Sequence, residues 1–126
     1  MNCCIIGIGS NIDPEENIRR AIEILENDLS VLGVSEMMKT EPIGIKNQPD
    51  FTNGAVKIET TLQQNELEHY LKNVEDQLKR DRKSPKFGPR TIDLDIVVWN
   101  GQVVDRDFYD RDFLQKSCAQ LGFEIK

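Results

Sequence analysis

Two segments of the chain carry apolar residues at helical spacing, and their positions limit the folds open to it. The first segment follows Asp13, where Pro14 and Glu16 complete the pattern of a capped helix start, and it ends near residue 29. The second runs from about residue 63 to residue 80. Each segment has one apolar stripe, so each helix must cover another surface. The two stripes consist of Ile18, Ala21, Ile22, Leu25 and Leu29, and of Leu67, Tyr70, Leu71, Val74 and Leu78.

The segments between and around these helices have the composition of strands. Residues 3–8 are nearly all apolar, which is typical of a strand buried on both faces. Residues 31–40 and 51–60 follow as two further strands, the second with clear alternation, and residues 91–99 form a fourth. The dipeptide Asn100-Gly101 predicts a tight turn that returns the chain as a short arm.

The resulting order is strand, helix, strand, strand, helix, strand. It predicts an α+β fold of the ferredoxin-like βαββαβ type, an antiparallel sheet with two helices on one face, plus a short C-terminal hairpin arm. The other face is left for a ligand or for covering segments. The length of 126 residues suits one domain, so we expect residues 1–126 to form a single unit. Residues 105–126 give no clear structural signal.

Composition narrows the range of partners. The net charge of −6 argues against a general nucleic-acid binder. No apolar run approaches the roughly 20 residues that span a bilayer, and the N-terminus lacks the basic region of a signal peptide. Cys3 and Cys4 are neighbours in a strand and point to opposite faces, so with Cys118 they suit apolar fillers in a reducing compartment. We therefore expect a cytoplasmic monomer that binds neither nucleic acid nor membrane.

The fourth predicted strand contains the most informative pair of residues, Asp93 and Asp95. Residues two apart in a strand share a face, so both carboxylates point the same way. Two carboxylates so close repel each other unless a cation compensates them. Oxygen ligands on a rigid strand suit Mg²⁺, whose remaining ligands are water and phosphate oxygens. The alternative interpretation is a strand with one solvated face on which acids are tolerated.

A basic segment leads directly into this strand. It holds six of the sixteen lysines and arginines of the chain: Lys79, Arg80, Arg82, Lys83, Lys86 and Arg90. Alone, these cations could complement the end of the second helix. Beside the two acids they favour a site that grips a polyphosphate and its metal ions. The sequence has no P-loop motif, and its single histidine, with no Cys-x-x-Cys, argues against a zinc site.

Several ordered motifs resemble a known family, 6-hydroxymethyl-7,8-dihydropterin pyrophosphokinase of folate biosynthesis, over about residues 5–101. These motifs are Gly9-Ser10-Asn11, Thr40-Glu41-Pro42-Ile43-Gly44, Asn47 to Asn53, Glu75 followed by Arg80 and Arg82, and Phe87 to Ile96. The resemblance implies transfer of the β,γ-pyrophosphoryl group of ATP to the hydroxymethyl oxygen of the pterin, with release of AMP.

The resemblance also implies residue roles. Asp93 and Asp95 would hold two Mg²⁺ ions, and with Arg80 and Arg82, which would close over the phosphates, they would form the catalytic set. Arg90 would lie near the nucleotide and the pterin. The other implied residues are Glu75 and Lys83 on the nucleotide side, and Thr40, Ile43, Phe51 and Asn53 at the pterin pocket.

The chain departs from the family after the last matched strand. The family has a Pro-His pair there, followed by an Arg and a Phe that help to bind both substrates, whereas residues 103–126 contain no histidine. Arg106 or Arg111 could replace the arginine. Two alternatives therefore stay open beside the enzyme: a non-catalytic or altered-substrate pterin- or nucleotide-binding relative, and an interaction domain without a small ligand.

Overall fold

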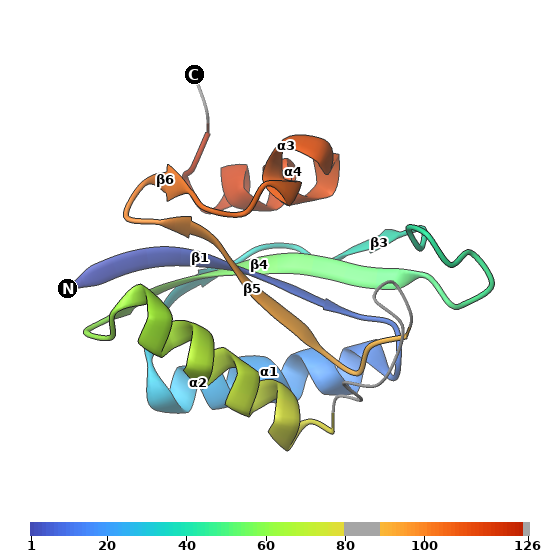
Figure 1. Cartoon of the computed structure of the whole chain (residues 1–126), viewed down its shortest axis with the longest axis horizontal. Helices are drawn as coiled ribbons and strands as arrows, with labels where there is room; N and C mark the ends of the chain where they lie inside the picture. The colour runs from blue at the N-terminus through green and yellow to red at the C-terminus, as the bar shows by residue number, and fades with distance from the viewer. Residues whose placement is uncertain (80–88, 125–126) are drawn as a thin grey trace.

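The computed structural model describes residues 1–79 and 89–124, and Figure 1 shows the arrangement of its elements. In chain order these are β1 (Asn2–Ser10), α1 (Pro14–Asp28), β2 (Ser30–Val34), β3 (Met38–Thr40), β4 (Phe51–Thr60), α2 (Gln64–Gln77), β5 (Asp93–Trp99), β6 (Gln102–Val103), α3 (Asp107–Asp110) and α4 (Asp112–Gln120).

The strands form one sheet in the order β2-β4-β1-β5-β6, with β3 paired to the other end of β4. Every pairing is antiparallel. The longest ladders join β1 to β4 and β1 to β5, so the first strand lies at the centre of the sheet. The predicted ferredoxin-like fold is confirmed, as is the hairpin arm, whose turn places Asn100 and Gly101 at φ angles of 48° and 83°.

Helices cover both faces of the sheet (Figure 1). On one face α1 and α2 pack on Ile6 and Ile8 of β1, as their apolar stripes predict. On the other face α3 and α4 cover one end of the sheet, where Ile5 and Val97 meet Phe108 and other apolar side chains. The face expected to hold a ligand or covering segments therefore carries a small second core and leaves the rest of the sheet surface open.

The predicted strand over residues 31–40 is interrupted, because Ser35 takes over the pairing to β4 with its side chain. Its backbone N–H donates to the Ala55 carbonyl at 2.9 Å, and its hydroxyl oxygen accepts from the Ala55 N–H at 2.8 Å. A side chain that replaces a carbonyl in the ladder ends the regular pairing, so β2 and β3 are separate short strands. The fourth predicted strand is also shorter than expected, since β5 begins at Asp93 rather than residue 91.

The predicted capping box of the first helix is wrong. Asp13 adopts the left-handed conformation, with φ at 42°, and its side chain makes no capping hydrogen bond. Glu16 instead pairs with Arg19 at 2.7 Å. A capping box does occur at the second helix, where the Gln63 N–H donates to Glu66 Oε1 at 2.8 Å. In the part of the chain that the structure describes, no helix has the length and apolar character to cross a membrane.

Candidate active site

Two glycines of the central strand, Gly7 and Gly9, form the open part of the sheet surface. In the register of β1 with its two neighbours, Gly9 lies between Asn53 of β4 and Asp93 of β5. Two residues earlier, Gly7 lies between Ala55 and Asp95. The two carboxylates thus flank one side of a floor without side chains, and Asn53 flanks the other. A ligand on this floor can contact both strands at once.

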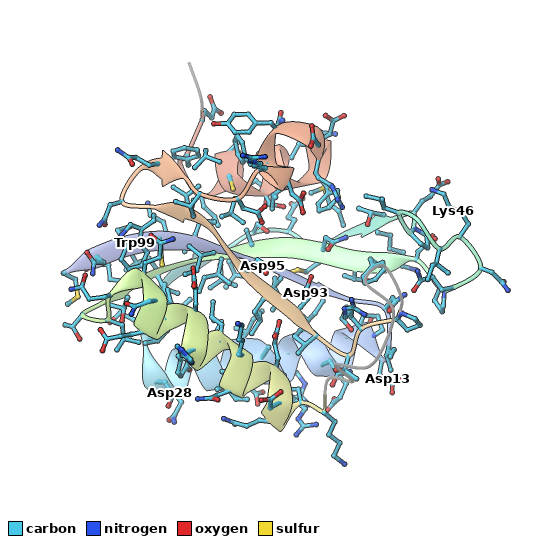
Figure 2. All side chains as sticks on the ribbon, viewed as in Figure 1. Asp13, Asp28, Lys46, Asp93, Asp95 and Trp99 are labelled. Carbon is cyan, nitrogen blue, oxygen red and sulfur yellow. The ribbon has the colours of Figure 1, made fainter. Side chains whose placement is uncertain are left out.

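Asp93 and Asp95 face the same cavity, about 90 Å³ in volume, above this floor. Between them, Leu94 points the opposite way into the core under α1 and α2. Figure 2 shows the two aspartates in succession along β5. The expectation that both acids leave the strand in one direction agrees with this geometry, because the side-chain period of the strand is two.

Burial among protein atoms raises the pKa of Asp95 to about 8, and the charges of Asp93, Asp105 and Glu75 add to this effect. Burial also raises the pKa of Asp105. The cluster is therefore an accumulation of negative charge that a divalent cation would relieve, and its oxygen donors suit Mg²⁺. Within residues 1–79 and 89–124, no three acidic, histidine or cysteine side chains form a ready metal cage. Water and phosphate oxygens would therefore have to complete the coordination of any ion held by Asp93 and Asp95.

A second cavity of about 240 Å³ adjoins the carboxylates at Asp93. It brings together all five residues expected near the pterin: Thr40, Ile43, Phe51, Asn53 and Arg90. The Asn53 amide nitrogen donates to Thr40 Oγ1 at 2.6 Å, which fixes the orientation of the amide. The lining combines an aromatic ring, an amide edge and a guanidinium, the groups that a flat heterocycle with polar edges would contact.

Asn11 holds the wall of this cavity in place, a role that the sequence did not reveal. Its side chain is buried at 4% exposure and connects three segments. Oδ1 accepts from the Arg90 N–H at 2.8 Å, while Nδ2 donates to Gln48 Oε1 at 2.9 Å and to the Pro49 carbonyl at 3.0 Å. The backbone N–H of Asn11 adds a bond to the Arg90 carbonyl at 3.1 Å. The Gly9-Ser10-Asn11 motif therefore joins the end of β1 to both sides of the cavity.

A larger cleft of about 660 Å³ opens on the other side of Asp95, along the part of β5 that β6 does not pair. Its walls come from α2 and from the segment before α3, and they include Lys72, Glu75 and Arg106. Glu75 is buried, and its carboxylate accepts from the Leu94 N–H at 2.8 Å. This bond fixes α2 against β5 beside the carboxylate pair.

The C-terminal helices bring further side chains to the site. Arg111 and Phe113 line the 240 Å³ cavity together with Asp107, and Arg111 lies 3.7 Å from the Asp107 carboxylate. The sequence offered Arg111 as one of two possible replacements but gave no reason to choose Phe113. An Arg followed two residues later by a Phe occurs twice, at Arg106 and Phe108 and again at Arg111 and Phe113, so the sequence alone could not select the second pair. The expected residues Arg80, Arg82 and Lys83 lie outside the described residues.

Comparison with known proteins agrees with the motifs. Residues 5–122 match the family model described as 7,8-dihydro-6-hydroxymethylpterin-pyrophosphokinase, so the match extends beyond residue 101 and includes both C-terminal helices. The chain is 34% identical to 2-amino-4-hydroxy-6-hydroxymethyldihydropteridine pyrophosphokinase of Bacillus subtilis, covering 99% of this chain and 81% of that protein.

Other relatives carry similar names. The Haemophilus influenzae pyrophosphokinase is 29% identical over 95% of this chain and 81% of its own length. The folate synthesis bifunctional protein of Arabidopsis thaliana is 31% identical over 82% of this chain, which spans about a fifth (22%) of that longer protein. With the family match covering nearly the whole sequence, this chain belongs to the 7,8-dihydro-6-hydroxymethylpterin-pyrophosphokinase family.

Proposed function

We propose that the chain is an ATP-dependent diphosphotransferase that converts 6-hydroxymethyl-7,8-dihydropterin and ATP into the pterin diphosphate and AMP. The observation that carries this proposal is the position of the carboxylate pair between two cavities. Asp93 lines the 240 Å³ cavity, Asp95 lines the 660 Å³ cleft, and both line the small cavity that lies between. A donor on one side and an acceptor on the other would meet at the two acids.

The smaller cavity suits the acceptor. Phe51 offers an aromatic surface for stacking on the pterin ring, and the Asn53 amide offers a donor and an acceptor to the ring edge. Thr40 orients that amide, and Ile43 supplies an apolar contact. With the ring held there, the hydroxymethyl group would extend toward Asp93.

The larger cleft suits the nucleotide. Asp93 and Asp95 would hold two Mg²⁺ ions, whose chemistry when bound is to neutralise and orient the polyphosphate. Arg80 and Arg82 would close over the phosphates, while Glu75 and Lys83 would serve the nucleotide side and Arg90 the boundary with the pterin. The hydroxymethyl oxygen then forms a bond to the β-phosphorus, the bond from that phosphorus to the bridging oxygen of AMP breaks so that AMP leaves with that oxygen, and the hydroxyl proton passes to solvent.

The relatives' names favour an enzyme over a non-catalytic relative, because they are pyrophosphokinases or folate-synthesis proteins. We further propose that residues 1–126 work as a single-domain monomer in the cytoplasm, with small molecules rather than nucleic acid or membrane as partners. The two large cavities suit small-molecule substrates.

The test is AMP formation from ATP and Mg²⁺, measured with and without hydroxymethyl dihydropterin. The proposal expects AMP to appear in proportion to the pterin consumed, and to fall to the blank when Mg²⁺ is chelated. Calorimetry on the same sample would show pterin binding. Pterin binding without AMP release would contradict the proposed reaction and would favour a non-catalytic pterin-binding protein.

A further inference from the structure

Gly9 lies on the floor of the site, and its lack of a side chain leaves room for the side chain of Asn53. It pairs with Asn53 in β4 and with Asp93 in β5, so it lies between the amide and the carboxylate proposed to act on the two substrates. As a nucleotide-binding motif the pair Gly7 and Gly9 has no value, since a third glycine is missing. Gly9 instead matters because a side chain at this position would occupy the volume that Asn53 fills.

The Asn53 amide occupies the volume that a side chain at position 9 would need. A Cβ built on Gly9 would overlap Asn53 Oδ1 and would lie 3.5 Å from Asn53 Cγ. The backbone is less restrictive, because the nearest main-chain atom, the Thr52 carbonyl oxygen, lies 3.8 Å from that Cβ. A methyl group here would therefore displace one side chain and leave the strand pairing intact.

The opposite end of the same amide is fixed by Thr40. Asn53 Nδ2 donates to Thr40 Oγ1 at 2.6 Å, across the pairing of β4 with β3. With its oxygen over the bare Cα of Gly9 and its nitrogen on Thr40, the amide has one defined orientation. Its depth in the cavity is set by how closely it can approach β1.

We propose that Gly9 is a positioning residue that holds the Asn53 amide at the depth and orientation needed to read the edge of a flat, polar heterocycle. The inference rests on the proposed function, because it assigns Asn53 to the pterin. An alanine at position 9 raises the amide from the floor, weakens its bond to Thr40 and moves it into the cavity. Recognition of the acceptor is weakened, while the nucleotide cleft on the far side of Asp95 is unchanged.

The test is a double-mutant cycle with Gly9→Ala, Asn53→Ala and the combined variant. Gly33→Ala is the matched control, since it adds a methyl to another strand of the sheet, where the nearest atom is a flexible Leu121 methyl at 3.2 Å. KM for the pterin and for ATP are measured for each protein, together with its thermal midpoint.

Gly9→Ala is expected to raise the pterin KM on the order of tenfold to a hundredfold, as a misplaced contact group does, with an ATP KM within about twofold of wild type. In the Asn53→Ala background the same change is expected to alter the pterin KM by less than about twofold, because the displaced group is already absent. Gly33→Ala keeps both constants. An unchanged pterin KM in Gly9→Ala, or an equal rise in both backgrounds, overturns the inference.

A second readout separates failure of this inference from failure of the proposed function. If the wild-type protein makes no AMP, the function falls, and the role of Gly9 is decided by the side-chain amide signals of Asn53 in two-dimensional NMR. Those signals are identified by their loss in Asn53→Ala. Gly9→Ala should shift them and Gly33→Ala should not; unshifted signals in Gly9→Ala would show that Gly9 does not position the amide.

Discussion

Replacing Asp95 with Asn is expected to stabilise the metal-free protein while it abolishes turnover. Burial raises the pKa of Asp95 to about 8, with further contributions from Asp93, Asp105 and Glu75. A raised carboxyl pKa means that the folded state disfavours the charged form. The metal-free protein is therefore most stable below pH 4 with respect to this group, and it loses that stability as the pH rises toward 8. Asn has nearly the same shape and no charge, so it removes the penalty.

The magnitude is moderate. Each pH unit by which a pKa moves corresponds to about 1.4 kcal/mol. With a fully buried carboxyl, the protein's free energy of unfolding would therefore fall by several kcal/mol by pH 8. Protein atoms surround the Asp95 carboxylate closely enough to raise its pKa, but a large part of the residue still meets solvent, and screening by water reduces such interactions to about 1 kcal/mol. For a domain of this size, a change of about 1 kcal/mol moves the melting temperature by roughly 4 °C.

The assay is thermal unfolding followed by circular dichroism at pH 5 and pH 8, with chelator and with Mg²⁺. The wild-type protein should gain stability from Mg²⁺ at pH 8, because an ion bound to the folded state shifts the equilibrium. Asp95→Asn should melt higher than wild type in chelator, with the larger gain at pH 8, and should not respond to Mg²⁺. Glu26→Gln, the same chemical change on the exposed side of α1, should behave as wild type.

Two results would contradict these expectations for Asp95. If metal-free Asp95→Asn melts below the wild-type protein at pH 8, the carboxylates do not repel one another in the folded state. If the variant keeps the full stabilisation by Mg²⁺, the ion is bound elsewhere in the protein.

Three other substitutions test separate parts of the structure. Asn11→Ala leaves buried partners such as the Arg90 N–H without an acceptor, so urea unfolding should show a free energy of unfolding lower by about 2–3 kcal/mol. A decrease of less than about 1 kcal/mol would contradict the hydrogen bonds assigned to this side chain. Arg111→Ala should raise the pterin KM about tenfold without lowering the melting temperature, because its pair with Asp107 at 3.7 Å is weak; a wild-type KM would exclude Arg111 from the site. Tyr70→Phe removes a bond to Asp28 at 2.7 Å between α2 and α1, and should cost about 1 kcal/mol in the same urea experiment; an unchanged midpoint would mean that the bond does not persist in solution.

Much of the fold could be predicted because its signals are local. The apolar stripes of α1 and α2 and the composition of β1 and β5 specify each element and the face it buries. The interruption at Ser35 could not be predicted, because it depends on where the hydroxyl meets Ala55 of another strand. The helices α3 and α4 were missed for a similar reason. They are short, and α3 packs through Phe108 into a core that also contains Ile5 and Ala55, which lie far away in the sequence.

The site divides in the same way. The shared direction of Asp93 and Asp95 follows from the period of a strand. The residues that the motifs led us to expect near the pterin, within residues 40–53 and at Arg90, line one cavity. Contributions that depend on tertiary structure could not be read from spacing. Among them are Asn11, which acts through bonds to residues 37 and 79 positions away, and Asp105, which lies between β6 and α3 and lines the same small cavity as the carboxylate pair.

We expect the nucleotide and the pterin to meet at the carboxylate pair. The most direct measurement is a crystal structure with a non-hydrolysable ATP analogue, hydroxymethyl dihydropterin and Mn²⁺, in which anomalous scattering locates the ions. We expect Mn²⁺ between the two aspartates and the β- and γ-phosphates, with the hydroxymethyl oxygen about 3–3.5 Å from the β-phosphorus. Ions bound away from both acids, or a pterin outside the cavity beside Asn53, would contradict this expectation.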